Sequence, residues 1–148
     1  MTFYTDWFVA DASEAESIAS LASCDDHSFE DWPHLALKGV ADFPLTLLRG
    51  ILRGKPGTAL KVDGESLFFD EDPEDGGMVS VTQVLPAFVA ELAALTAAQL
   101  RRAAAGWHEC EGMTDWAAAD VARCLKEMAA FARRANRASK PVLCLSTV

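Results

Sequence analysis

Cysteine and histidine side chains that stand close together are the residues with the most specific chemistry in this sequence. Two residues separate Cys24 from His27, and one residue separates His108 from Cys110. Thiolate and imidazole are the usual zinc ligands, so these side chains are metal candidates if the two segments meet in the fold. Structural zinc sites normally use cysteine pairs two residues apart, so the other interpretation is ordinary loop thiols beside loop histidines. We expect no metal and no other cofactor.

Cys110 could instead serve as a nucleophile, with His27 or His34 as its base and an acid such as Asp25 behind the histidine. A cysteine nucleophile needs a positive neighbour or a helix N-terminus to lower its pKa. The residues on both sides of Cys110 are glutamates, which push the pKa of its thiol upward. A catalytic cysteine is therefore disfavoured, and we assign no catalytic residue.

Acidic residues are concentrated in two segments of the chain. Residues 1–37 carry eight acids and no Lys or Arg, residues 63–75 carry seven acids and no base, and the net charge is −9. Such a field repels phosphate, which argues against nucleic acid, and it favours a basic protein partner. We predict a binding surface with Trp32 as its anchor and an acidic rim made of Asp25, Asp26, Glu30 and Asp31. The alternative is that the acids only keep the protein in solution.

Length and composition indicate one domain over residues 1–148 with a core of ordinary size, since 51% of the residues are apolar. No apolar run reaches the roughly 20 residues that a membrane span needs. Met1–Asp6 contains no Lys or Arg, so we expect no secretory signal. Cys124 and Cys144 lie in apolar patterns and are expected to be reduced core thiols, which indicates the cytoplasm.

Apolar periodicity predicts the elements of the first half of the chain. Thr2–Val9 is typical of a strand, and a short helix capped by Asp11 and Glu14 follows it. A second helix is expected to begin at Asp42-Phe43-Pro44 and to end at Gly54. The dipeptide Asp63-Gly64 predicts a hairpin turn between Ala59–Val62 and Ser66–Asp70. Asp70–Gly77 is expected to be a charged surface loop.

The second half is predicted to be mostly helical. Met78–Val84 is typical of a strand, Pro86 starts a helix, and Thr96 with Gln99 caps another that Gly106 ends. Trp107–Met113 is expected to be a loop. The longest helix is predicted over Asp115–Asn136. The buried stripe of this helix would hold Val121, Leu125, Met128, Phe131, Ala132 and Ala135. Pro141–Thr147 is predicted to be a final strand.

This order of elements predicts an α+β fold, in which a small mixed β-sheet packs against several helices and a long C-terminal helix precedes the final strand. Two segments resemble the YfbM-like family of uncharacterised bacterial proteins. They are His34–Gly54, with its amphipathic helix, and Met78 onward, with Leu85-Pro86 and the closing KPVLCLSTV. The resemblance implies a bacterial cytosolic protein with a small α+β fold, and it implies no functional residue.

Two classes of function remain open. The first is a non-enzymatic, acidic protein-interaction module that binds a basic partner, as immunity proteins do when they neutralise basic toxins. The second is a small enzyme or a small-ligand-binding domain. It would use the loops that contain His27, His34, His108 and Cys110. The shortage of convergent polar residues favours the first, and the oligomeric state is left open.

Overall fold

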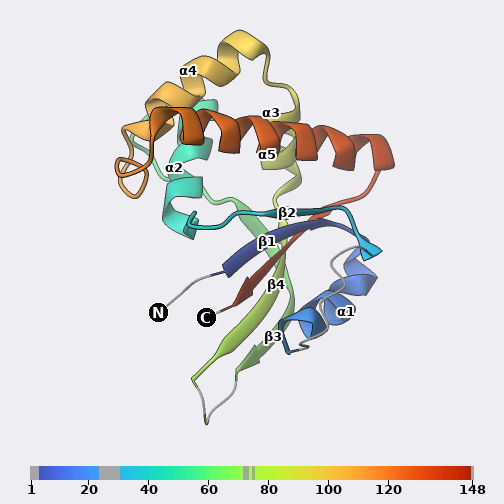
Figure 1. The fold of residues 1–148 in the computed structure, drawn as a ribbon. Helices are drawn as coiled ribbons and strands as arrows, with labels where there is room; N and C mark the ends of the chain where they lie inside the picture. Colours follow the sequence, from blue (N-terminus) through green and yellow to red (C-terminus); the bar gives the residue numbers. More distant parts are fainter. Residues whose placement is uncertain (1–3, 24–30, 72–73, 75, 148) are drawn as a thin grey trace.

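The computed structural model describes residues 4–23, 31–71, 74 and 76–147. Within them the chain forms a five-stranded sheet in the order β2-β1-β5-β4-β3 (Figure 1). The strands are β1 (Tyr4–Val9), β2 (His34–Ala36), β3 (Asp63–Glu71), β4 (Met78–Val84) and β5 (Val142–Thr147). The helices are α1 (Ala15–Ala19), α2 (Asp42–Leu52), α3 (Pro86–Ala93), α4 (Ala97–His108) and α5 (Ala118–Ala138), and short 3-10 turns (Ala12–Glu14 and Ser20–Ser23) flank α1. The predicted α+β class is confirmed, with a long helix before the last strand.

The sheet is antiparallel rather than mixed. Each neighbouring pair of described strands runs in opposite directions: β2 with β1, β1 with β5, β5 with β4, and β4 with β3. The helices α3, α4 and α5 return the chain to the end of the sheet at which β4 stops, so β5 runs back beside β4. A parallel pair would need a crossover to the other end.

The helices form two unequal layers. Figure 1 shows α2, α3, α4 and α5 gathered on one side of the sheet, with α1 on the other. Successive side chains of β1 point to opposite faces of the sheet, so this strand contributes to both cores. Trp7 packs into the large helical core, and its neighbour Phe8 packs into the smaller core under α1. The predicted stripe of α5 is buried throughout. Its members are Val121, Leu125, Met128, Phe131, Ala132 and Ala135.

Two predicted boundaries in the helical layer are wrong. α4 does not end at Gly106 but continues to His108, and Trp107 is fully buried instead of lying in a loop. The indole Nε1 of Trp107 donates a hydrogen bond to the Pro44 carbonyl at 2.9 Å. This buried contact holds the last turn of α4 against α2. Local helix propensity contains no information about such a distant contact, so the sequence did not predict the extra turn. α5 begins at Ala118, three residues later than Asp115.

The hairpin predicted at Asp63-Gly64 is also wrong, because both residues lie in β3. The observed hairpin joins β3 to β4, and it turns between Glu71 and Met78. A side chain at Gly64 would approach the Gln83 carbonyl at 3.1 Å, so the glycine serves the close approach of two strands and not a turn. No helix in the described part of the chain is both long and apolar enough to cross a membrane.

Candidate functional site

The predicted acidic surface is described only in part. Asp25, Asp26 and Glu30 lie outside the described residues, and Asp31 is exposed. Trp32 is half-buried, and its Nε1 donates a hydrogen bond to Glu14 Oε2 at 2.7 Å. Its ring meets Phe8 edge to face with centroids 6.2 Å apart. The indole therefore has partners within its own chain, and its use as an anchor for a protein partner stays a prediction.

Glu14 is held by two donors. Besides the Trp32 indole, the backbone N–H of Asp11 donates to Glu14 Oε1 at 3.1 Å, which is half of the predicted capping box. Hydrogen bonds to the charged form favour it. The bond from Trp32 first, and that from Asp11 second, lower the pKa of the Glu14 carboxyl.

The predicted metal ligands are described only in part. Cys24 and His27 fall outside that part. His108 Nε2 lies 2.7 Å from the Trp116 carbonyl oxygen, and the Cys110 thiol donates to the Gly106 carbonyl at 3.5 Å. No cluster of three or more potential ligands is found among the described residues. The ligand pairs therefore stay a prediction that rests on the sequence.

His34 lies on the short edge strand β2, with its own partners. Its Nε2 is 2.8 Å from Asp6 Oδ1, and its ring stacks on Phe8 at a centroid distance of 5.0 Å. His34 and His108 therefore belong to different strand and helix neighbourhoods, which weakens the idea of one site that uses both.

The thiols are poorly suited to nucleophilic work. Burial and then the Glu109 carboxylate raise the pKa of the Cys110 thiol. Burial first, with nearby carboxylates second, raises the pKa of Cys124 to about 11 and that of Cys144 to about 12. Cys144 is 3% exposed, as expected for a core thiol, whereas Cys124 is only half-buried.

A surface that the sequence did not predict lies on the β3–β4 hairpin. Phe69 is 60% exposed and Met78 is 37% exposed. The register pairs Phe69 with Ser80 and Glu71 with Met78, so Phe69, Glu71 and Met78 share one face of the hairpin. Contiguous exposed apolar patches mark interaction sites, and Phe69 with the partly exposed Met78 is the candidate for such a patch on this hairpin.

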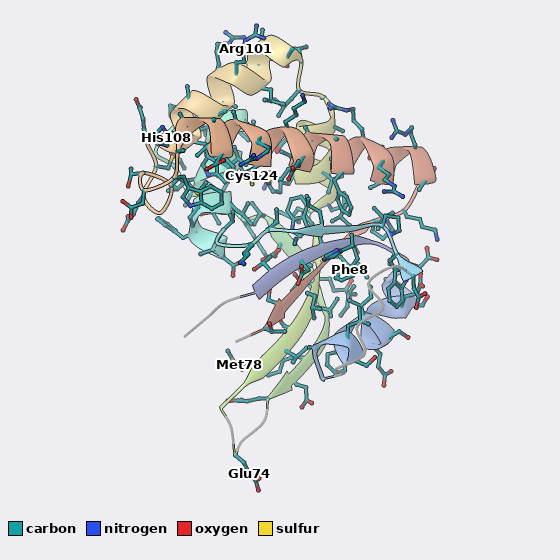
Figure 2. All side chains as sticks on the ribbon, in the orientation of Figure 1. Phe8, Glu74, Met78, Arg101, His108 and Cys124 are labelled. Carbon is teal, nitrogen blue, oxygen red and sulfur yellow. The ribbon has the colours of Figure 1, made fainter. Side chains whose placement is uncertain are left out.

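The hairpin carries negative charge only. Residues 63–84 contain no Lys or Arg, and Glu65, Asp70 and Glu71 of β3 are exposed. Glu71 shares the face of Phe69 and Met78, whereas Asp70, which pairs with Val79, lies on the opposite face. Figure 2 shows Glu74 and Met78 toward the tip of the hairpin, away from the helical layer. We call the group of Glu65, Phe69, Asp70, Glu71 and Met78 the hairpin surface. β3 is also an edge strand of the sheet, with a neighbour on one side only among the described strands.

The sequence of β3 contains a sign of this surface, but it does not show which side chain is exposed. Leu67-Phe68-Phe69 is an apolar run between acids, and alternation alone does not say which phenylalanine faces water. Irregularities in the pairing between Asp63 and Phe68 set the phase. As a result Phe68 packs against the core under α1, and Phe69 is left exposed.

A polar cluster lies where β3 meets the helical layer. Burial and then the Asp42 carboxylate raise the pKa of Asp63, although its hydrogen bond with Thr82 works in the opposite direction. Asp63 also contributes to the raised pKa of Cys144, and the Cys144 thiol lies 3.7 Å from Ser146 Oγ. The cluster disfavours ionisation of both the thiol and Asp63, so it is a poor source of a thiolate nucleophile.

The fold and the hairpin surface thus define a small α+β domain with an acidic, partly apolar projection. Comparisons with protein-family models, with curated proteins and with solved structures found no match for this chain.

Proposed function

We propose that this chain is a non-enzymatic protein-interaction module that binds a basic protein through the hairpin surface. One observation carries the proposal: Phe69 and Met78 are 60% and 37% exposed on one face of a hairpin without a basic residue. Aromatic and methionine side chains are enriched at the centres of protein interfaces, and charged groups at their rims. Phe69 and Met78 would therefore form the centre, with Glu71 beside them on the same face.

The acids would act chiefly on the rate of association. Glu65, Asp70 and Glu71 would attract a positively charged partner. Attraction of this kind raises the association rate constant and fades as salt screens it over roughly 10 Å at 0.1 M ionic strength. A module of this type would work as immunity proteins do, by covering a basic surface on a toxin.

We also infer that the module acts in the cytoplasm of a bacterium. The unpaired thiols of Cys110, Cys124 and Cys144 support this, because reduced thiols persist in that compartment.

Quantitative capture from the lysate of a bacterial host tests the proposal. The double variant Phe69→Ser/Met78→Ser removes the apolar centre, and we expect it to retain less than about a tenth of the basic proteins held by the wild type, since the few side chains that dominate an interface lie near its centre and cost about 2 kcal/mol or more when truncated. Both side chains are exposed, so the melting temperature should hardly change.

Phe43→Ser is the matched control, because Phe43 is 51% exposed on α2 and lies outside the hairpin. Capture by this variant should equal that of the wild type. If the hairpin variant also captures as well as the wild type, or if the captured proteins are acidic, the proposal is wrong.

A further inference from the structure

A groove between α2, α3 and α4 lies apart from the hairpin surface. It has a volume of about 500 Å³, within the range of roughly 300–1,000 Å³ that is usual for small-molecule sites. Its apolar lining comes from the end of α2, the end of α3 and the middle of α4. The residues are Ile51, Leu52, Ala94, Leu95 and Ala103.

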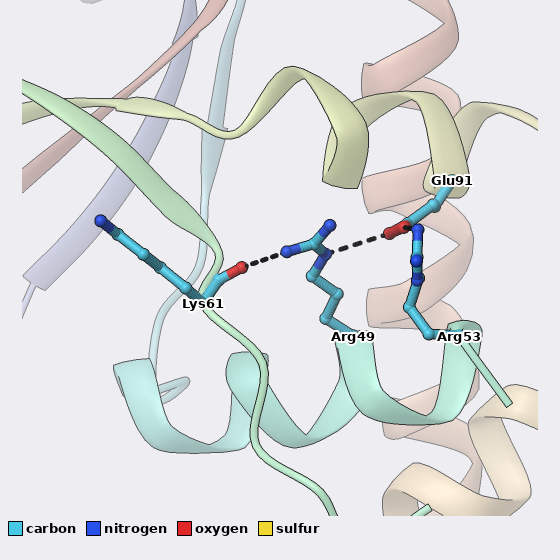
Figure 3. A network of polar contacts seen from close by, with 4 residues as sticks. All are labelled: Arg49, Arg53, Lys61 and Glu91. Carbon is cyan, nitrogen blue, oxygen red and sulfur yellow. Dashed lines mark hydrogen bonds and ion pairs between the residues drawn. The ribbon is translucent and has the colours of Figure 1, made fainter. Parts of the chain in front are cut away.

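The polar lining of this groove consists of Glu91, Gln99 and Arg102. Two further arginines, Arg49 and Arg53, do not line the groove but bind the Glu91 carboxylate. Arg49 Nε and Arg53 Nη1 each lie 3.3 Å from one oxygen of the Glu91 carboxylate (Figure 3). The Glu91 carboxylate is therefore already paired with Arg49 and Arg53, which leaves the charge of Arg102 in the groove without a carboxylate of its own among the lining residues.

These arginines differ in exposure and in the number of contacts that each makes within the protein. Arg49 is 14% exposed, and besides Glu91 it bonds the Lys61 carbonyl at 2.6 Å, so its position is fixed (Figure 3). Arg53 is 52% exposed and contacts Glu91 through Oε1 alone. Arg102 is exposed. A guanidinium presents its N–H groups as a planar fork that suits a carboxylate, whereas Glu91 takes only one contact from each of Arg49 and Arg53.

We propose that this groove binds an organic anion with an aliphatic chain, of the medium-chain carboxylate class. The chain would lie on Ile51, Leu52 and Leu95, and the head group would receive hydrogen bonds from Arg102, the arginine that lines the groove. Binding would add a carboxylate to the cluster that Glu91 now neutralises incompletely. The site is separate from the hairpin surface, so it does not depend on the proposed protein partner.

Calorimetric titration of the full chain with decanoate, kept below its micelle concentration, tests this directly. We expect saturable binding with one site per chain. Decyltrimethylammonium, which has the same chain and the opposite charge, should bind at least about tenfold more weakly, as should acetate, which has the head group alone.

Variants locate the site. Arg102→Gln should weaken decanoate binding about tenfold or more, since a charge-assisted hydrogen bond is lost. Arg101→Gln is its matched control, because Arg101 is the adjacent exposed arginine of α4 and does not line the groove; its affinity should equal that of the wild type. Ala94→Trp fills the groove from an exposed position and should abolish binding.

Melting temperatures close to that of the wild type show that each variant is folded. The proposal is overturned by any of four results: decanoate fails to saturate the protein, the cationic analogue binds equally well, Ala94→Trp leaves binding intact, or Arg101→Gln weakens it as much as Arg102→Gln does.

Discussion

Trp32 donates its indole N–H to Glu14 at 2.7 Å, across 18 residues of sequence. The contact joins the segment that precedes β2 to the turn that precedes α1. Phe8 of β1 supports the same ring from its edge. The smaller core is therefore closed by an aromatic residue whose polar edge is bonded to a charged acceptor, and this arrangement has a measurable consequence for Glu14.

Replacing Trp32 with Phe should raise the pKa of Glu14 toward its ordinary value, because the bond from the indole is the largest cause of the lowered pKa. A carboxyl whose pKa is lowered by folding stabilises the protein above the pKa it has when unfolded, and this contribution is lost as the pH falls through the folded-state value. The stability difference between wild type and variant should therefore narrow on acidification. A carboxyl-detected NMR titration of both proteins measures the pKa, and an unchanged value would contradict the contact.

Replacing Asp63 with Asn should stabilise the protein at neutral pH. Burial and the Asp42 carboxylate raise the pKa of Asp63, so the folded state disfavours its ionised form. The resulting cost is absent below the pKa of the unfolded chain and fully present above the folded-state value. Denaturant unfolding should show a larger free energy of unfolding for Asp63→Asn than for the wild type at pH 7 and not at pH 3. An increase of equal size at both pH values would mean that the charge of Asp63 is not the cause.

The thiols should differ in reactivity toward a bulky disulfide reagent. In a Cys24→Ser background at pH 8 we expect Cys110 to react first, Cys124 more slowly, and Cys144 only on unfolding. The reason is that burial raises the pKa of Cys124 to about 11 and that of Cys144 to about 12, and the thiolate is the reacting form. Mass spectrometry of native protein over time gives the order, and rapid labelling of Cys144 would place β5 outside the core.

Two glycines in helices should respond oppositely to a methyl group. A Cβ at Gly50 would lie 1.9 Å from the Thr58 carbonyl oxygen, whereas a Cβ at Gly106 would meet Ile51 at an ordinary 3.5 Å. Gly50→Ala should therefore destabilise the protein by about 1–3 kcal/mol or more, the usual cost of overpacking. Gly106→Ala should be neutral or stabilising by up to about 1 kcal/mol, the helix propensity difference. Thermal unfolding of both variants checks this, and equal effects would contradict the close approach at Gly50.

Periodicity and capping residues predicted the elements whose signals are local. β4 covers Met78–Val84 as expected, α3 starts at Pro86, and the Thr96–Gln99 capping box has both of its hydrogen bonds. The stripe of α5 is amphipathic at helical spacing, so its buried face was visible in the sequence. These elements need no knowledge of their neighbours.

The errors arose where a distant contact decides the conformation. Gly106 was expected to end α4, but the helix continues to His108, because the buried Trp107 of its last turn is bonded to the Pro44 carbonyl of α2. Asp63-Gly64 was expected to turn, but pairing with β4 holds it extended. The hairpin surface went unpredicted for the same reason, because the irregular pairing of β3 decides that Phe69 and not Phe68 faces water. In the predicted acidic surface, Trp32 was expected to be an anchor for a partner, and in the structure its indole contacts Glu14 and Phe8 of its own chain.

Photo-crosslinking from the hairpin tests the central proposal most directly. Phe69 is replaced by the photoreactive amino acid p-benzoylphenylalanine, which fits an exposed aromatic position, and the protein is irradiated in host lysate. The control carries the same amino acid in place of Arg101, which Figure 2 places at the opposite end of the molecule from Glu74. We expect discrete adducts with basic proteins from position 69, diminished by the further changes Asp70→Asn and Glu71→Gln, and none of these adducts from position 101. Identical adducts from both positions, or none from position 69, would contradict binding through the hairpin surface.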